Sequence, residues 1–135
     1  MTTFHTAPPS AATMGAPAFD RVVVVEPGVR AVAHLNVTGT LPLFATHFPR
    51  YPVLPGVLLI ESALALARLA AGEPGLRLRH ATRLRFRRFV VPGDQVELTV
   101  TALADEDGHA APNRWRFEAL VAGEPAASIA SLTVA

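Results

Sequence analysis

The sequence predicts an α+β protein in which one long central helix is wrapped by a curved antiparallel β-sheet of about six strands. The first observation is a long apolar segment, residues 56–71, that begins after Pro55 and stops at Gly72. The second is the order of elements, with two strand-like runs before this segment and about four after it. An antiparallel sheet around a single apolar helix is the economical packing for that order.

The composition is that of one globular domain with a single core, since half of the 135 residues are apolar and 17% are charged. A net charge of +1 argues against a protein built mainly to hold nucleic acid. The absence of cysteine excludes disulfides and cysteine-ligated zinc. The longest apolar run is too short to span a membrane, and the N-terminus is a poor secretion signal, so we expect a cytoplasmic protein.

Residues 1–18 are rich in Ala, Pro, Thr and Ser and have no periodicity, which predicts a disordered N-terminal tail before one domain of residues 19–135. The domain opens with two β-rich runs around the turn sequence Glu-Pro-Gly at 26–28. In the second run, apolar and polar residues alternate, so one face of this strand is apolar. The apolar positions are Val29, Ala31, Ala33, Leu35 and Val37.

Four further strands are expected after the helix. Residues 76–86 alternate between arginine and mainly apolar residues, and a Pro-Gly-Asp turn at 92–94 introduces the next strand. Residues 114–123 and 126–134 provide the last two strands. One face of the third strand in this group carries Trp115, Phe117, Ala119 and Val121, which are expected in the core.

Glu61 is the most unusual residue of the apolar helix, because it is the only acidic residue between positions 26 and 73. One interpretation is a carboxylate paired with an arginine such as Arg68. The other is a functional acid, because an apolar environment disfavours the charged form and keeps a proton available for donation. An unpaired buried polar group costs about 2–7 kcal/mol. We favour the functional acid, since His47 supplies a complementary group.

His47 and Gly56 provide two further parts of a possible site. His47 lies in a proline-rich segment with a constrained backbone, which suits a general base, although a loop histidine without a role is the alternative. Gly56 begins the helix, where free N–H groups and the positive dipole end can hold an oxyanion. Taken alone, a simple helix-start glycine explains Gly56 equally well. Base, acid and oxyanion donor together suit elimination of water from a 3-hydroxyacyl group, or the reverse.

Residues 47–62, HFPRYPVLPGVLLIES, resemble the signature of the hot-dog-fold 3-hydroxyacyl-acyl carrier protein dehydratases of the FabZ/FabA type. The family pattern is His-Phe-Pro-Gly-x-Pro-x-x-Pro-Gly-Val-x-x-x-Glu/Asp, with the same spacing between histidine and carboxylate. Residues 83–100, RLRFRRFVVPGDQVELTV, are similar to the strand-turn-strand segment of that family. The resemblance covers about residues 19–134.

The resemblance implies that two protomers pair into one continuous sheet, with the histidine of one chain meeting the carboxylate of the other. It implies His47 as the general base, Glu61 as the general acid and the Gly56 N–H as the oxyanion donor. The substrate-binding set is completed by Pro55, Phe48 and Val57. The substrate rides on the phosphopantetheine of an acyl carrier protein, and no metal or bound cofactor is needed. The resemblance does not determine the oligomeric state, which can be a homodimer, a dimer of dimers or a heterodimer with a second hot-dog protein.

Four residues depart from the family pattern: Thr46, Arg50, Ala65 and Phe89. They leave the acyl-chain preference open and suit polyketide or polyene assembly as well as fatty acid synthesis. Two alternative functions are a hot-dog acyl thioesterase and a non-catalytic hot-dog subunit that supports an active partner. The intact His-Phe-Pro motif argues against the thioesterase.

Arginines gather along residues 77–88. One interpretation is a solvated face that blunts an exposed strand. The other, held about level, is a docking surface for an acidic carrier protein. Nucleic acid is less favoured because no aromatic residues of a known binding motif accompany the arginines. The candidate docking residues are Arg83, Arg85, Arg87 and Arg88.

Overall fold

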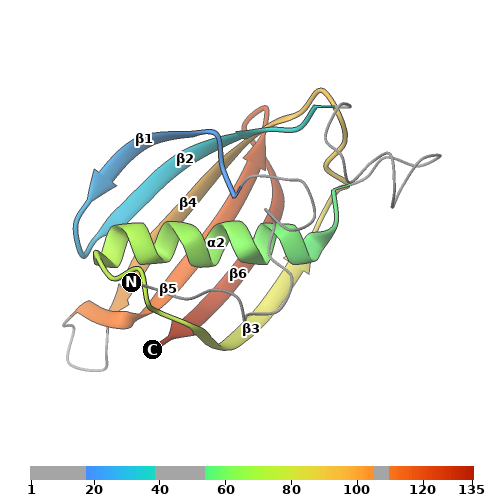
Figure 1. Cartoon of the computed structure of the whole chain (residues 1–135). Helices are drawn as coiled ribbons and strands as arrows, with labels where there is room; N and C mark the ends of the chain where they lie inside the picture. Colours follow the sequence, from blue (N-terminus) through green and yellow to red (C-terminus); the bar gives the residue numbers. More distant parts are fainter. Residues whose placement is uncertain (1–17, 39–53, 105–109) are drawn as a thin grey trace.

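A computed structural model describes residues 18–38, 54–104 and 110–135, and only the backbone of 110–112. Within these ranges one helix lies across a sheet of six strands (Figure 1). The elements are β1 (Arg21–Glu26), β2 (Arg30–Asn36), α2 (Gly56–Ala71), β3 (Leu78–Phe86), β4 (Gln95–Ala104), β5 (Ala110–Val121) and β6 (Glu124–Val134). The predicted α+β class and the predicted bounds of the helix are confirmed.

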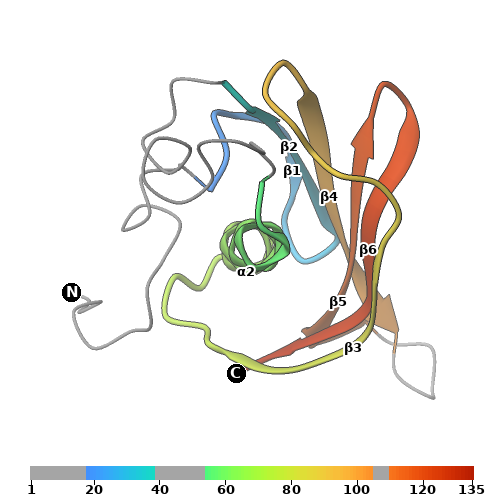
Figure 2. The same cartoon turned by 90° about the vertical axis from the view of Figure 1, so that its right-hand side faces the viewer.

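The sheet has the strand order β1-β2-β4-β5-β6-β3, and all neighbouring strands are antiparallel. Viewed along the helix axis, the sheet curves around α2 (Figure 2). The segment between β2 and β3 connects strands that are not neighbours, and it carries α2 across the concave face. Strands β1 and β3 are the two edges of the sheet.

The core lies between α2 and the concave face of the sheet. The predicted inward face of β5 is confirmed, because Trp115, Phe117, Ala119 and Val121 are all buried. From the helix, Leu58, Leu59, Ala63, Leu66, Ala67 and Ala70 are buried against these strands. Full burial of one large apolar side chain contributes about 1.5–3 kcal/mol to stability. This packing determines which face of α2 points inward.

Both ends of α2 follow from the local sequence. Pro55 precedes the helix with extended dihedral angles, as expected for a residue that cannot donate a backbone hydrogen bond. Gly72 ends the helix in the left-handed conformation at φ 71°, which favours glycine because a Cβ is strained there. The N–H of Gly72 donates to the carbonyl of Leu69 at 3.2 Å, which satisfies one of the last helical carbonyls.

Backbone hydrogen bonds from two other loops hold α2 in position. Before its N-terminus, the N–H of Leu54 donates to the carbonyl of Val90 at 2.7 Å. Near its C-terminus, the N–H of Gly28 in the β1–β2 turn donates to the carbonyl of Ala70 at 2.8 Å. The helix is therefore fixed at both ends by the main chain as well as by its packed side chains.

One face of the helix is only partly covered by the described residues. The apolar sequence predicted burial on most sides, yet Val57 is 54% exposed and Leu69 is 40% exposed. Ile60, Glu61, Ala65 and Arg68 are half-buried. We call these six residues the outward strip. They are apolar except for Glu61 and Arg68.

Strand β3 also differs from an ordinary half-buried strand, because its large apolar residues are exposed as well as its arginines. It lies at the edge of the sheet and pairs only with β6. The helix packs mainly against β2, β4 and β5 rather than against β3. Alternation in sequence therefore does not produce a buried face in this strand. The exposed apolar residues are Leu78, Leu84 and Phe86, with Phe89 just beyond the strand.

The predicted tail of residues 1–18 lies outside the described residues except for Ala18. The boundary at residue 19 therefore stays a prediction. Within the described ranges, α2 is too short to cross a membrane.

Candidate active site

Among the described residues, no side chain caps the backbone N–H groups at the N-terminus of α2. The first N–H groups of any α-helix lack partners within the helix. At Pro55, which precedes α2, no side chain provides the missing acceptor, and the first turn contains no acidic residue. The N–H groups at Gly56 and Val57 therefore lie at the positive end of the helix dipole, an arrangement that suits an oxyanion.

Gly56 is in close contact with an aromatic ring of the edge strand. A Cβ atom added to Gly56 would lie 2.8 Å from Cε1 and 2.9 Å from Cζ of Phe86. Phe86 is nevertheless 54% exposed, so its ring lies beside the helix N-terminus and is only partly covered. No local sequence pattern indicates this contact of Phe86, because the two residues are thirty positions apart.

Glu61 lies on the outward strip and not in the core. It follows Gly56 by five residues, which is about 7.5 Å along the helix axis. Among the described residues, the carboxylate has neither a hydrogen bond nor an ion pair. Arg68, the partner considered in the alternative interpretation, instead donates from Nε to the carbonyl of Leu76 at 2.6 Å. The described residues thus offer no structural pairing for this carboxylate.

Two of the predicted site residues, His47 and Phe48, lie outside the described residues. The distance between His47 and Glu61 is therefore untested, and their cooperation stays a prediction. The other predicted positions, Pro55, Gly56 and Val57, lie together at the start of α2. Of this group Val57 is the most exposed.

The four candidate docking arginines lie on β3 and directly after it, and all are exposed. They do not form one equivalent set. Arg88 lies 3.5 Å from the carboxylate of Asp94, in the Pro-Gly-Asp turn that precedes β4. Arg83 has a left-handed backbone conformation, with φ 53°, in the middle of the strand. Among the described residues, Arg83, Arg85 and Arg87 have no ion-pair partner, so their charges are available for a partner molecule.

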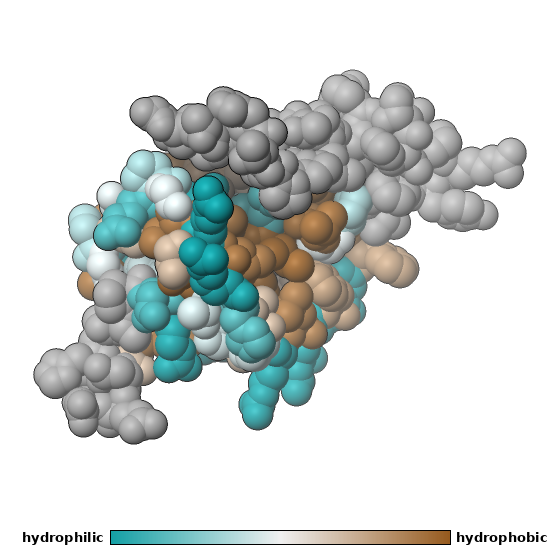
Figure 3. All heavy atoms as spheres, turned by 60° about the horizontal axis from the view of Figure 1, so that its bottom comes forward, coloured by the Kyte–Doolittle hydropathy of each residue, from teal (hydrophilic) through white to brown (hydrophobic). Residues whose placement is uncertain are grey.

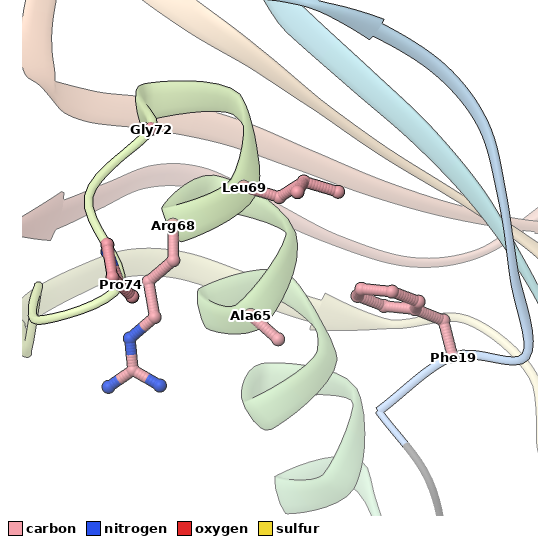
Figure 4. A pocket seen from close by; sticks show the side chains of 6 residues that line it. All are labelled: Phe19, Ala65, Arg68, Leu69, Gly72 and Pro74. Carbon is pink, nitrogen blue, oxygen red and sulfur yellow. The ribbon is translucent and has the colours of Figure 1, made fainter. Parts of the chain in front are cut away.

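A groove lies at the C-terminal half of α2 and has a volume of about 460 Å³ (Figure 4). Its lining residues are Phe19, Ala65, Arg68, Leu69, Gly72 and Pro74. Helical spacing from Glu61 could have identified Ala65 and Gly72, but Phe19 is brought there only by the fold.

Seen from the side at the bottom of Figure 1, the surface shows hydrophobic residues among hydrophilic ones (Figure 3).

No cluster of three or more His, Asp or Glu residues that could hold a metal ion occurs in the parts of the chain that the structure describes.

A family model described as ApeI-like, ApeI dehydratase, matches residues 25–127. The chain belongs to this dehydratase family. A relative in Chromobacterium violaceum, the 3-hydroxyacyl-acyl-carrier-protein dehydratase FabZ, is 42% identical over 115 residues, covering 79% of this chain and 75% of the relative. The FabZ of an Anaeromyxobacter species is 48% identical over 91 residues, covering 60% of this chain and 58% of the relative. The predicted dehydratase class is thereby confirmed.

Solved structures confirm the hot-dog fold. The dehydratase heterocomplex ApeI:P from Xenorhabdus doucetiae is similar with a TM-score of 0.66 and 23% identity, covering 84% of this chain and 95% of that one. The uncharacterized protein PH1136 from Pyrococcus horikoshii has a TM-score of 0.67 and 15% identity, covering 93% and 88%. At these identities the likeness concerns the fold alone.

Proposed function

We propose that this hot-dog dehydratase removes water from a 3-hydroxyacyl thioester carried on an acyl carrier protein and releases the trans-2-enoyl thioester. Family membership supports the reaction class, and the relatives named FabZ support the substrate. The observation that carries the proposal within the chain is Glu61, a carboxylate without a described partner on the outward strip. It lies one and a half turns beyond the uncapped helix start at Gly56.

The proposed reaction assigns one role to each group. His47 accepts the proton from C2, and the resulting negative charge on the thioester oxygen is held by the N–H of Gly56. The C3–O bond then breaks, and the leaving hydroxyl takes a proton from Glu61 to become water. Pro55, Val57 and Phe48 are proposed to shape the substrate site around these groups. The three steps balance without a metal or redox cofactor, and we propose none.

The proposed site is shared between two copies of the chain. Strand β3 is an edge with exposed apolar side chains, and such an edge is suited to pairing with another strand. We propose that two β3 strands pair in a homodimer, which can associate further into a dimer of dimers, and that His47 of one copy serves Glu61 of the other. A heterodimer with a second hot-dog protein is the alternative assembly.

The acyl carrier protein is proposed to bind at Arg83, Arg85 and Arg87. Among the described residues these three arginines have no ion-pair partner, and their charges would attract an acidic partner and accelerate its association. Arg88 is a weaker candidate because Asp94 already lies beside its guanidinium. We propose a cytoplasmic role in the assembly of fatty acids or of polyketide and polyene chains.

The proposal is tested by intact-mass analysis of a 3-hydroxyacyl carrier protein after incubation with the wild type, His47→Ala or Glu61→Gln. The wild type should remove the mass of one water, and loss of either proton-transfer group should slow this by about 10²-fold or more. Release of the free acid instead would identify a thioesterase. An inactive wild type that gains activity only with a second hot-dog protein would identify a supporting subunit. Either outcome would overturn the proposal.

A further inference from the structure

Strand β3, whose edge is proposed to pair between two copies, carries basic side chains and no acidic ones. The sequence contains no Asp or Glu between Glu73 and Asp94, a stretch that includes the whole of β3 and six arginines. Among the described residues, Arg83, Arg85 and Arg87 have no ion-pair partner. This edge therefore has a positive charge that its own segment of the chain does not balance.

The pairing of β3 with β6 shows on which face its side chains lie. Leu84 is opposite Ile129, and Phe86 is opposite Ala127, and both partners on β6 are buried. Leu84 and Phe86 therefore lie on the face toward α2. Arg85 lies between them in the strand and projects from the other face, which is the convex side of the sheet in Figure 2.

The carboxylate in the same row of the sheet as Arg85 is too distant to neutralise it. Arg85 is opposite Ser128 on β6, and Ser128 is opposite Glu118 on β5. Glu118 thus lies two strands away from Arg85, which is about 10 Å. Its carboxylate is already 3.5 Å from the guanidinium of Arg116. The charge of Arg85 is therefore open to a ligand on the convex face.

Pairing of two β3 strands brings like charges together. In an isologous antiparallel pair, side chains of one face lie opposite side chains of the same face in the other copy. Because β3 contains no acidic residue, no register of Leu78–Phe86 against the same residues of a second copy places a carboxylate opposite an arginine. Like charges directly opposite one another destabilise a strand pair. The proposed dimer therefore needs negative charge from outside the two strands.

We propose that two paired β3 strands form a binding site for a small multivalent anion of the phosphate type, and that this anion stabilises the dimer. Its ligands are Arg83, Arg85 and Arg87 of both copies, so that the site is incomplete in a single chain. Arginine suits this role because its planar guanidinium binds phosphate through two parallel hydrogen bonds. The inference rests on the β3 pairing of the proposed function and adds a ligand on which that pairing depends.

The site makes assembly depend on anions in a characteristic direction. An interface held by salt bridges weakens as salt is added, because the attraction is screened. The β3 pair should instead tighten, because the repulsion between its arginines is screened or neutralised. Since the proposed active site combines His47 of one copy with Glu61 of the other, the anion would also set the amount of active enzyme at low protein concentration.

The experiment measures the monomer–dimer Kd of the full chain by sedimentation velocity, in NaCl alone and with inorganic pyrophosphate at matched ionic strength. Raising the ionic strength from about 0.01 M to about 0.15 M shortens the Debye length from about 30 Å to about 8 Å, and this should lower the Kd by about tenfold or more. At equal ionic strength, pyrophosphate should lower the Kd about tenfold further than chloride does, because it binds several guanidinium groups at once.

Two arginine variants test whether the response comes from this edge. Arg85→Gln removes one charge per copy from the middle of the site, so it should flatten the salt dependence and remove most of the pyrophosphate effect. Arg21→Gln is the matched control, because Arg21 is an exposed arginine of the other edge strand, β1. Its Kd should respond to salt and pyrophosphate as the wild-type Kd does. Thermal unfolding verifies that both variants are folded.

The outcomes separate this inference from the function on which it rests. A Kd that rises or stays constant with salt, or that responds to pyrophosphate no more than to chloride, overturns the anion site and leaves the β3 pairing intact. Equal responses of Arg85→Gln and Arg21→Gln overturn it as well. A chain that is monomeric under every condition contradicts the pairing and this inference together. Dehydration of a carrier-bound substrate, measured in the same samples, tests the proposed reaction separately.

Discussion

The ring of Phe86 lies directly against the backbone of Gly56, so that a Cβ atom at position 56 would stand 2.8 Å from Cε1 of that ring. This distance is shorter than any ordinary carbon–carbon contact, and a side chain at position 56 requires the ring to move. The contact joins the start of α2 to the end of the edge strand β3. Two separate constraints therefore favour glycine at position 56. A side chain there would collide with the Phe86 ring, and it would also hinder access to the Gly56 N–H.

A pair of substitutions separates these two reasons. Gly56→Ala should lower kcat/KM for the carrier-bound substrate by about tenfold or more, because the new methyl group narrows the approach to the oxyanion donor. The half-exposed ring can rotate away, so the melting temperature should change little. The double variant Gly56→Ala with Phe86→Ala should stay impaired. If its activity instead returned to that of Phe86→Ala alone, the glycine would serve only the ring.

Mixing two inactive variants tests whether the site is shared between subunits. His47→Ala and Glu61→Gln should each be nearly inactive alone. When they are unfolded together and refolded as a mixture, heterodimers form that contain one intact site, which restores about a quarter of the wild-type sites. The measurement is the dehydration rate of the refolded mixture against each variant refolded alone. No recovery in a mixture with the wild-type dimer content would place both groups in the same chain.

We expect a charged substitution to disrupt assembly when it lies on the edge strand β3 but not when it lies on the edge strand β1. Leu84 on β3 is 37% exposed and Val22 on β1 is 40% exposed, so the two positions form a matched pair. Leu84→Arg should shift the protein to a smaller species in sedimentation velocity, because a buried unpaired charge opposes pairing of two β3 strands. Val22→Arg should sediment as the wild type does. The reverse pattern would show that β1 is the paired edge.

Ser62 provides a test of the attachment between the helix and the segment before β1. The side chain is 1% exposed, and its hydroxyl donates to the carbonyl of Ala18. Ser62→Ala removes this bond and leaves a carbonyl without its donor, so the free energy of unfolding should fall by about 1–3 kcal/mol. Ser128→Ala is the control, since no described residue bonds the Ser128 hydroxyl. Equal urea midpoints for both variants would contradict the structural role of Ser62.

The sequence was sufficient for most of the fold because its signals are local. Pro55 and Gly72 mark the ends of α2, and the alternation around Trp115 marks the buried face of β5. The same alternation rule failed to predict the burial of β3, because its alternation between arginine and leucine does not lead to a buried face. Whether a strand lies at an edge depends on the pairing of all six strands, which no local pattern contains.

The candidate site was predictable where its residues are close in sequence. Gly56 and Glu61 lie on one helix, so their separation follows from helical geometry alone. Phe86 and Phe19 reach the same helix from distant strands, and their contributions required the tertiary structure. The prediction for His47 depends on a segment outside the described residues, and it awaits the variants proposed above.

The two main-chain hydrogen bonds that hold α2, from Leu54 to Val90 and from Gly28 to Ala70, do not depend on the chemistry of any side chain in the outward strip. Substitutions at strip positions other than Glu61 can therefore accumulate without removing either of these two main-chain bonds. During evolution, such a design allows the range of accepted molecules to diverge quickly while the reaction is preserved. Selection for new substrates would then act on the outer surface of a helix whose inner surface maintains the fold.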